Sequence, residues 1–194
     1  MQTTYEVKVW DPLVRVFHWS LVTAFAVAYI TEDHYLGLHT QAGYTIIGLV
    51  LFRLVWGVIG TRHARFSDFV RGPGAVRDYL KRLLHKRPAH YLGHNPAGGW
   101  MVITLLVALL LTTLSGLLTY GIGENAAGPF AALAGNPEGF MSEAMEEVHE
   151  FLAHFTVLLV FVHIAGVVVS GWLHHENLVR AMLTGRKPLV PSED

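Results

Sequence analysis

Four long apolar segments alternate with polar ones along the chain. They cover residues 12–30, 39–59, 98–120 and 148–173. A helix needs about 20 residues to cross the hydrocarbon of a bilayer, which is about 30 Å thick. Lipid offers the backbone no hydrogen bonds, so apolar segments of this length predict membrane-spanning helices. We therefore expect an all-α fold, an integral membrane four-helix bundle, with residues 1–194 as a single membrane domain.

The start of the first helix is marked by its flanking residues. Residues 1–11 are polar and lack the pattern of a cleaved signal peptide, so we expect the first apolar segment to stay in the membrane. Asp11 precedes Pro12. An aspartate that caps a helix, followed by proline at the first helical position, predicts that the helix begins at Pro12.

Composition strengthens the membrane assignment and narrows the chemistry. Hydrophobic residues make up 52% of the chain and charged residues 15%, with a mean hydropathy of +0.39. A soluble domain usually has about 25% charged residues. There is no cysteine, which excludes disulfides, iron–sulfur clusters, thiolate-ligated haem and covalently attached c-type haem. The twelve histidines leave imidazole as the abundant metal ligand.

Charge indicates how the chain lies in the membrane. The loops at 31–38 and 121–147 contain no Lys or Arg, and the fourteen basic residues lie elsewhere, mostly in the loop at 60–97. The two non-basic loops carry seven carboxylates: Glu32, Asp33, Glu124, Glu138, Glu143, Glu146 and Glu147. The positive-inside rule therefore predicts that both termini and the loop at 60–97 are cytoplasmic.

The two long loops have features of their own. Residues 75–84 alternate apolar and basic positions at helical spacing, which predicts a helix at the level of the lipid headgroups. A solvated helix without lipid contact is the alternative. Residues 121–141 are rich in Gly, Ala and Pro and are expected to cover a site at the outer face.

Five histidines lie within or next to the predicted spans. Polar side chains are costly in a bilayer, so these are functional candidates: His18, His39, His149, His154 and His163. The other seven lie in loops or at helix ends and are assigned no special role: His34, His63, His85, His90, His94, His174 and His175.

The spacing of His149 and His163 indicates two cofactor sites. They are 14 residues apart on one predicted helix. At about 1.5 Å and 100° per residue they lie about 21 Å apart along the helix and about 40° apart around it. Ligands of a single metal would lie within one or two turns. Two stacked haems across the membrane fit this spacing.

Depth then predicts the pairing of the ligands. His39 opens the second helix on the outer side, level with His149, and His18 lies about two turns into the first helix, nearer to His163. We expect two bis-histidine sites, His39 with His149 and His18 with His163, built inside the bundle.

Two arginines and a further histidine lie near the predicted haem sites. Arg53 follows His39 by 14 residues on the same helix face, and Arg15 lies one turn before His18. Both are expected to bind haem propionates; the alternative for Arg53 is that it reaches the headgroups. His154 follows His149 by five residues, so the two cannot share a zinc ion as in an H-E-x-x-H motif. It is expected to pack or hydrogen bond, or else to replace an axial ligand.

Small residues in the spans would allow porphyrin or helices to approach closely, although helix packing alone also explains them. They are Gly43, Gly48, Ser115, Gly116 and Gly166.

Several motifs together resemble the bacterial cytochrome b561 and nickel-hydrogenase b-type cytochrome family over nearly the whole chain. They are the stretch 9–12 running into 15–19, His39 with Gly43 and Arg53, residues 93–100, and His149–Glu150 with His163. The resemblance implies two b haems ligated from the first, second and fourth helices, and a multi-pass protein of the bacterial inner membrane.

The resemblance also implies electron transfer, between the quinone pool and a c-type cytochrome or another redox partner. The acidic outer loops suit a lysine-rich c-type cytochrome. The polar residues beside the inner haem indicate a quinone site at the cytoplasmic end, near Trp172, His174, His175 and Arg53. The partners expected are membrane lipid, quinone and a redox protein, with no nucleic acid.

Three alternatives stay open. In the first, the chain resembles an enzyme that oxidises superoxide and reduces quinone, although the acidic outer loops would repel the superoxide anion. In the second, it is similar to the b-type cytochrome subunit of a hydrogenase-like complex, although such subunits are typically longer. Last, a membrane anchor or metal-ion transporter would use His149 and His163 along a substrate path.

Overall fold

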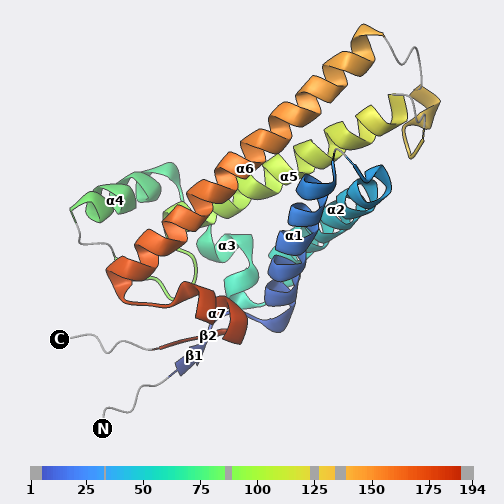
Figure 1. The fold of residues 1–194 in the computed structure, drawn as a ribbon. Coiled ribbons are helices and arrows are strands. Elements are labelled where there is room, and N and C mark those ends of the chain that lie inside the picture. Colours follow the sequence, from blue (N-terminus) through green and yellow to red (C-terminus); the bar gives the residue numbers. More distant parts are fainter. Residues whose placement is uncertain (1–5, 33, 86–88, 123–126, 134–138, 189–194) are drawn as a thin grey trace, which may run out of the picture. The chain divides into compact units, whose positions relative to one another are not determined.

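The fold is all-α apart from one pair of short strands. The computed structural model describes residues 6–32, 34–85, 89–122, 127–133 and 139–188. Its elements in chain order are β1 (Glu6–Lys8), α1 (Pro12–Thr31), α2 (Leu36–Ile59), η1 (Arg62–Ala64), α3 (Phe66–Phe69), α4 (Pro73–Leu84), α5 (Pro96–Ile122), η2 (Ala131–Leu133), α6 (Phe140–His174), α7 (Leu178–Thr184) and β2 (Arg186–Pro188). Figure 1 shows this order along the chain.

Four helices of the described residues are long and apolar enough to cross a membrane: α1, α2, α5 and α6. Each contains one predicted span, so the all-α membrane helical bundle is confirmed. Large apolar side chains such as Val16, Val58 and Phe161 are mostly exposed on these helices, which suits contact with lipid. Helix α6 begins at Phe140, ahead of the span expected from 148, because residues such as Met145 and Glu146 favour helix outside the bilayer as well.

The chain divides into two compact units. Unit 1 comprises Met1–Trp19, Phe52–Ile103 and Val162–Asp194, and unit 2 comprises Ser20–Leu51 and Thr104–Phe161. His18 and His163 belong to unit 1, whereas His39 and His149 belong to unit 2. Each predicted histidine pair therefore lies within one unit.

Unit 1 joins the two ends of the described chain. Strands β1 and β2 pair antiparallel, with Val7 opposite Lys187 (Figure 1). The amides of Val9 and Trp10 both donate to the Gly185 carbonyl, at 2.8 and 3.1 Å. Gly185 has φ +80°, and a Cβ there would lie 2.6 Å from the Trp10 oxygen. Only glycine fits this turn, which positions Trp10 in the core of unit 1.

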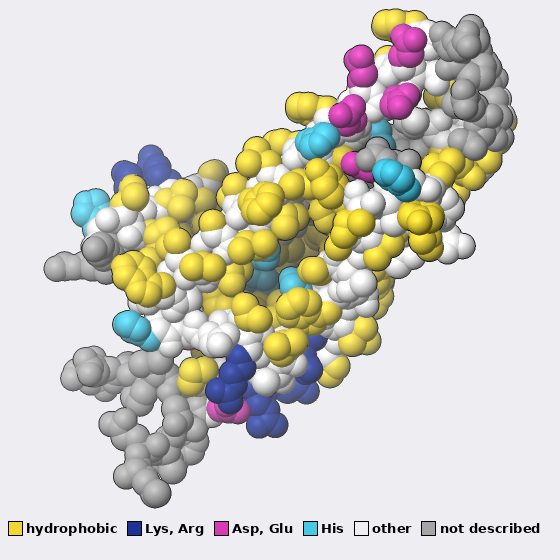
Figure 2. All heavy atoms as spheres, in the orientation of Figure 1, with side chains coloured by type: hydrophobic (Ala, Val, Ile, Leu, Met, Phe, Trp, Pro, Cys, Tyr) yellow, Lys and Arg dark blue, Asp and Glu magenta, His cyan; other side chains and the backbone are white. Residues whose placement is uncertain are grey.

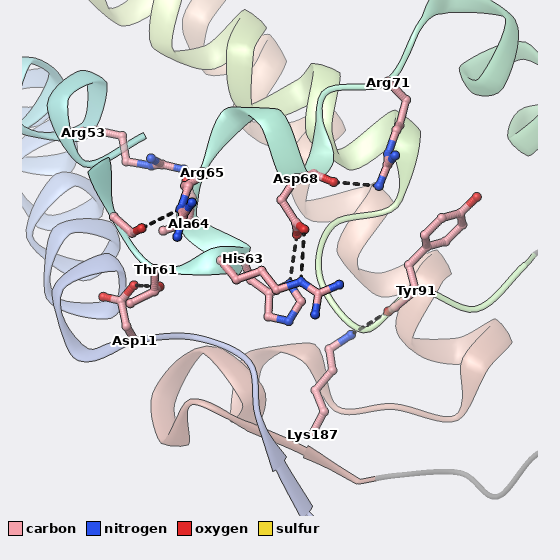
Figure 3. A network of polar contacts seen from close by, with 12 residues as sticks. Asp11, Arg53, Thr61, His63, Ala64, Arg65, Asp68, Arg71, Tyr91 and Lys187 are labelled. Carbon is pink, nitrogen blue, oxygen red and sulfur yellow. Dashed lines mark hydrogen bonds and ion pairs between the residues drawn. The ribbon is translucent and has the colours of Figure 1, made fainter. Parts of the chain in front are cut away.

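The cap predicted at the start of α1 is present and has a second role. Asp11 Oδ1 accepts from the Val14 amide at 2.9 Å, which confirms the capping of a helix that begins at Pro12. Its Oδ2 accepts from Thr61 Oγ1 at 2.6 Å (Figure 3). It also accepts from Trp56 Nε1 at 3.2 Å. One buried carboxylate thus connects the start of α1 to the end of α2.

Buried charges fasten the C-terminal strand within unit 1. Lys187 Nζ lies 2.9 Å from Glu176 Oε2, and His90 Nε2 lies 2.6 Å from Glu176 Oε1. Lys187 is only 4% exposed, so this pair is shielded from solvent. Its Nζ also points toward the Tyr91 carbonyl at 3.5 Å (Figure 3).

Helix α4 (Pro73–Leu84) contains the helix predicted at residues 75–84. It begins at Pro73 after Gly72 and buries only Tyr79, while Leu80, Leu84, Arg77 and basic neighbours are exposed. Figure 2 shows basic side chains gathered over this helix. Contact with lipid headgroups stays a prediction for this surface.

Unit 2 is built around α5 and α6, which lie side by side in it (Figure 1). The hydroxyls of Thr112 and Thr156 meet at 3.1 Å, and Thr156 is fully buried. The end of α1 is bonded to the residue before α2, since the Tyr35 amide donates to the Thr31 carbonyl at 3.0 Å. Of the seven outer carboxylates, Asp33, Glu124 and Glu138 lie outside the described residues.

Candidate haem sites

The structure brings His39 and His149 together in unit 2. Their ring centroids are 5.9 Å apart and their planes cross at 88°. A bond from imidazole nitrogen to a metal is about 2 Å long, so two imidazoles on opposite sides of one metal have ring centres about 6 Å apart. The observed separation matches that requirement. The two side chains come from α2 and α6, as the depth argument predicts.

Backbone carbonyls determine which nitrogen of each ring carries the proton. His39 Nδ1 lies 2.9 Å from the Ala28 carbonyl, and His149 Nδ1 lies 3.0 Å from the Thr112 carbonyl. A carbonyl oxygen only accepts, so each Nδ1 donates a proton and each Nε2 keeps its lone pair. Histidine ligands of metals almost always donate their other ring N–H in this way. Both rings are therefore prepared to bind a metal through Nε2.

Two small residues of α5 make room for the His149 ring. Ser115 Oγ lies 3.1 Å from His149 Nδ1, and the same hydroxyl donates to the Thr112 carbonyl at 2.9 Å. A Cβ at Gly116 would lie 2.7 Å from His149 Cε1. Glycine is therefore required for the imidazole to occupy this position. Nothing lies within 4 Å of a Cβ placed at Gly43, Gly48 or Gly166, so of these four glycines only Gly116 has a close protein neighbour, and the approach of porphyrin to the other three stays a prediction.

His18 and His163 lie together in unit 1 but are held differently. They are close enough to interact electrostatically, and the His18 ring packs edge-on against Trp19 at 5.1 Å. His18 Nδ1 is buried and has no hydrogen-bond partner. A buried polar atom without a partner is costly and indicates a group that a ligand satisfies.

Unit 1 also holds every other buried side-chain nitrogen that lacks a partner in the described part of the chain. These atoms are Arg15 Nε, Arg53 Nη1 and His94 Nδ1. Arginine N–H groups only donate, so they suit an anion. The site thus fits a group that carries carboxylates beside a metal, as haem does.

Arg53 is buried in unit 1 and does not reach solvent. It is 3% exposed, its Nη2 donates to the Ala64 carbonyl at 2.9 Å, and its guanidinium lies 4.8 Å from the Phe66 ring centre. Figure 3 shows the side chain turned toward Ala64. The burial does not suit the alternative in which Arg53 extends to the headgroups.

His94 is a residue whose position the sequence did not reveal. It was assigned to the basic loop, yet its ring lies between Trp10 and Phe69, with both centroid distances at 4.6 Å. Burial, together with the charges of Arg53 and Lys187, lowers the pKa of His94 to about 3. The imidazole is therefore neutral. The one feature of the sequence that could have singled out His94 is its place in the 93–100 motif, directly before α5.

His154 and the residues suggested for a quinone site take no part in the two histidine pairs. His154 is exposed, bonds the Glu150 carbonyl of its own helix at 3.0 Å and packs edge-on against Tyr29. In the region suggested for quinone, Trp172 is 68% exposed and His174 faces His90 at 5.5 Å, whereas Arg53 packs on α3. A quinone site there stays a prediction, as does His175.

Comparison with known proteins gives the following similarities. The model of the prokaryotic cytochrome b561 family matches residues 9–185. A probable Ni/Fe-hydrogenase B-type cytochrome subunit of Bradyrhizobium diazoefficiens is 22% identical over 93% of this chain and 85% of its own length. The subunit of the same name from Azotobacter vinelandii is 25% identical over 92% of this chain and 87% of its own length. No solved structure matches.

Proposed function

Since the chain belongs to the prokaryotic cytochrome b561 family, we propose that it holds two b haems, one between His39 and His149 and one between His18 and His163. It is a b-type cytochrome of the membrane, and its function is electron transfer. The pairing of ligands and the number of haems are the parts of the proposal that go beyond the family.

The observation that carries the proposal is the hydrogen bonding of the His39 and His149 rings. Both Nδ1 protons are held by backbone carbonyls, at 2.9 and 3.0 Å, and both Nε2 atoms keep a lone pair. His85 and His154 also bond a carbonyl through Nδ1, but within their own helices, whereas His39 and His149 each bond a carbonyl of a neighbouring helix and face each other. Two such rings with centroids 5.9 Å apart could hold one iron between them.

The residues of the chain have separate tasks around the cofactor. A bound haem supplies one-electron redox chemistry. Each haem would be held by two histidines, which would leave no position on the iron for oxygen or substrate. The carbonyls of Ala28 and Thr112 draw on the Nδ1 protons and make the imidazoles stronger donors. In unit 1, Arg15 and Arg53 have free donors that suit propionates.

Haem content tests the proposal directly. Protein purified in detergent is expected to contain two haems per chain, to show sharp reduced b-type bands and to give the spectrum of low-spin bis-histidine iron. Colourless protein that binds zinc in place of haem would contradict the proposal and favour metal transport.

The acidic end of unit 2 supports a basic redox partner at the outer face. Exposed carboxylates gather around the first turns of α6 (Figure 2), at Glu143, Glu146, Glu147 and Glu150. Opposite charge speeds the encounter of redox proteins. We propose a lysine-rich c-type cytochrome as partner and the quinone pool as the other exchange partner. Turnover with a basic cytochrome should fall as ionic strength rises, and insensitivity to salt would contradict this.

A hydrogenase-like partner is the second candidate, because the relatives above are named as hydrogenase cytochrome subunits. Membranes that contain the protein separate the two. Reduction of its haems by hydrogen gas favours the hydrogenase complex, and reduction by quinol followed by oxidation by cytochrome c favours the first candidate. Superoxide as a substrate is disfavoured by the same carboxylates.

The absence of cysteine gives a clean test of orientation. We propose a protein of the bacterial inner membrane with both termini and the segment containing α4 in the cytoplasm. A single cysteine at Gly74 should be labelled by an impermeant thiol reagent only after cells are opened. One at Glu146 should be labelled in intact spheroplasts. The reverse result would invert the topology.

A further inference from the structure

The segment before α5 places the His94 ring against two aromatic side chains of unit 1. Its ring lies 4.6 Å from both the Trp10 and the Phe69 rings, and its Nδ1 has neither solvent contact nor a hydrogen-bond partner. A nitrogen left in this way costs free energy unless a ligand satisfies it.

Close packing holds His94 in this place. A Cβ at Gly93 would lie 3.2 Å from His63 Nδ1, and His63 is itself held by Asp68 at 2.9 Å (Figure 3). A Cβ at Gly99 would lie 2.6 Å from the Phe69 carbonyl oxygen. The two glycines on either side of His94 therefore let the segment lie directly against α3 and its flank.

Arg53 shares the Phe69 ring with His94. Its guanidinium carbon is 5.9 Å from the Phe69 centroid, and its Nη1 is buried without a partner while Nη2 is used by Ala64. A guanidinium and a neutral imidazole beside one aromatic ring offer two N–H donors and a single positive charge. This combination matches a carboxylate, which has two acceptor oxygens and one negative charge.

We propose that Arg53 and His94 together bind one carboxylate, a propionate of the haem held by His18 and His163. The inference rests on the proposed function and adds His94 as a residue that positions the cofactor. Arg15, whose Nε is also free, lies on α1 one turn before His18 and suits the second propionate.

The test compares haem with its dimethyl ester, which has the same ring and iron but no propionate charge. Full-length protein that carries His149→Ala, so that only the unit 1 site takes haem, is produced without haem and titrated with each compound. We expect haem to bind about tenfold or more tightly than the ester, as charged hydrogen bonds of this kind contribute.

Two substitutions remove one donor each in that background. Arg53→Met and His94→Phe should lower the ratio of haem to ester affinity toward one, while the affinity for the ester stays the same. Phenylalanine keeps the packing against Trp10 and Phe69. His94→Gln, which keeps a donor, should recover part of the ratio, and His85→Phe, at an exposed histidine of the loop, should leave it unchanged. Helix content measured by circular dichroism checks that each variant folds.

The outcomes separate the two levels of the proposal. Ratios that stay at the wild-type value in both variants would overturn the carboxylate pair, as would an equal loss of haem and ester. The same results would follow if a free anion or a lipid phosphate occupied the site. If the parent protein binds neither compound through His18 and His163, the proposed haem function itself fails.

Discussion

The two histidine pairs differ in what holds their imidazoles. In unit 2, backbone carbonyls and a serine fix His39 and His149, so the rings are ordered by the protein itself. In unit 1, His18 Nδ1 is buried without a partner and is accompanied by unpartnered donors of Arg15, Arg53 and His94. The protein itself satisfies the Nδ1 atoms of the first pair, whereas in unit 1 the free donors of Arg15, Arg53 and His94 would be satisfied by the carboxylates of a bound haem. We infer that cofactor binding stabilises unit 1 more than unit 2.

The difference also bears on the redox potentials. A carbonyl that accepts the Nδ1 proton makes imidazole a stronger donor, which stabilises ferric iron. His39 and His149 both have such a carbonyl, whereas His18 has none. We therefore expect the haem of unit 2 to have the lower midpoint potential. A redox titration that resolves two steps measures the order.

The largest expected effect comes from removing a ligand. His39→Ala and His149→Ala should each remove the haem of unit 2, and His18→Ala and His163→Ala that of unit 1, which leaves one haem per chain in every case. Haem content and redox titration distinguish the two classes. If His18→Ala and His149→Ala lose the same haem, the pairing is wrong.

Gly116→Ala should damage the unit 2 site alone. The new Cβ would lie 2.7 Å from His149 Cε1 and would force the ring away from Thr112. Loss of such a supporting contact costs about 10- to 100-fold in metal affinity. Gly74→Ala is the control, since nothing lies within 4 Å of a Cβ at that position and it belongs to α4, outside the membrane spans. Haem retention during dilution in detergent measures both, and equal retention would contradict the role of Gly116.

Acid should weaken unit 1 through Asp11. Burial alone would raise the pKa of Asp11, but hydrogen bonds from Thr61, Val14 and Trp56 outweigh it and hold the pKa below the ordinary value of 3.8. The stabilisation is thus fully present above about pH 4 and is lost as pH falls through the folded-state pKa. Asp11→Ala should lower the free energy of unfolding by about 1–2 kcal/mol at neutral pH.

Tryptophan fluorescence follows this transition, because Trp10 lies in the core of unit 1 and Trp56 packs against that core. Asp11→Asn cannot ionise and should remove the part of the acid dependence that Asp11 causes. An unchanged acid midpoint in that variant would assign the effect to other carboxylates of unit 1, such as Glu176.

Ser115→Ala should have the smallest effect. It removes one of two contacts of His149 Nδ1, and the Thr112 carbonyl at 3.0 Å remains as acceptor. The haem of unit 2 should be retained, with less than about tenfold weaker binding and a small shift in potential. Complete loss of this haem would show that the serine, and not the carbonyl, holds the ring.

The sequence by itself determined the four membrane helices and the level of each histidine. Apolar length decides which segments enter a bilayer, and helical geometry decides which residues share a face, so both follow from local pattern. His39 and His149 were placed opposite each other on these grounds, and the Asp11 cap was located from two adjacent residues.

Only the tertiary structure decided how the sites are supported. The carbonyls of Ala28 and Thr112, the space at Gly116 and the position of His94 between Trp10 and Phe69 depend on residues far apart in the chain. The pairing of β1 with β2 likewise joins segments at opposite ends; the alternation of polar and apolar residues from Glu6 to Val9 fits a strand but does not identify its partner. Hydrogen bonds and close packing are properties of neighbours in space, so a linear pattern specifies the ligands but not the atoms that hold them.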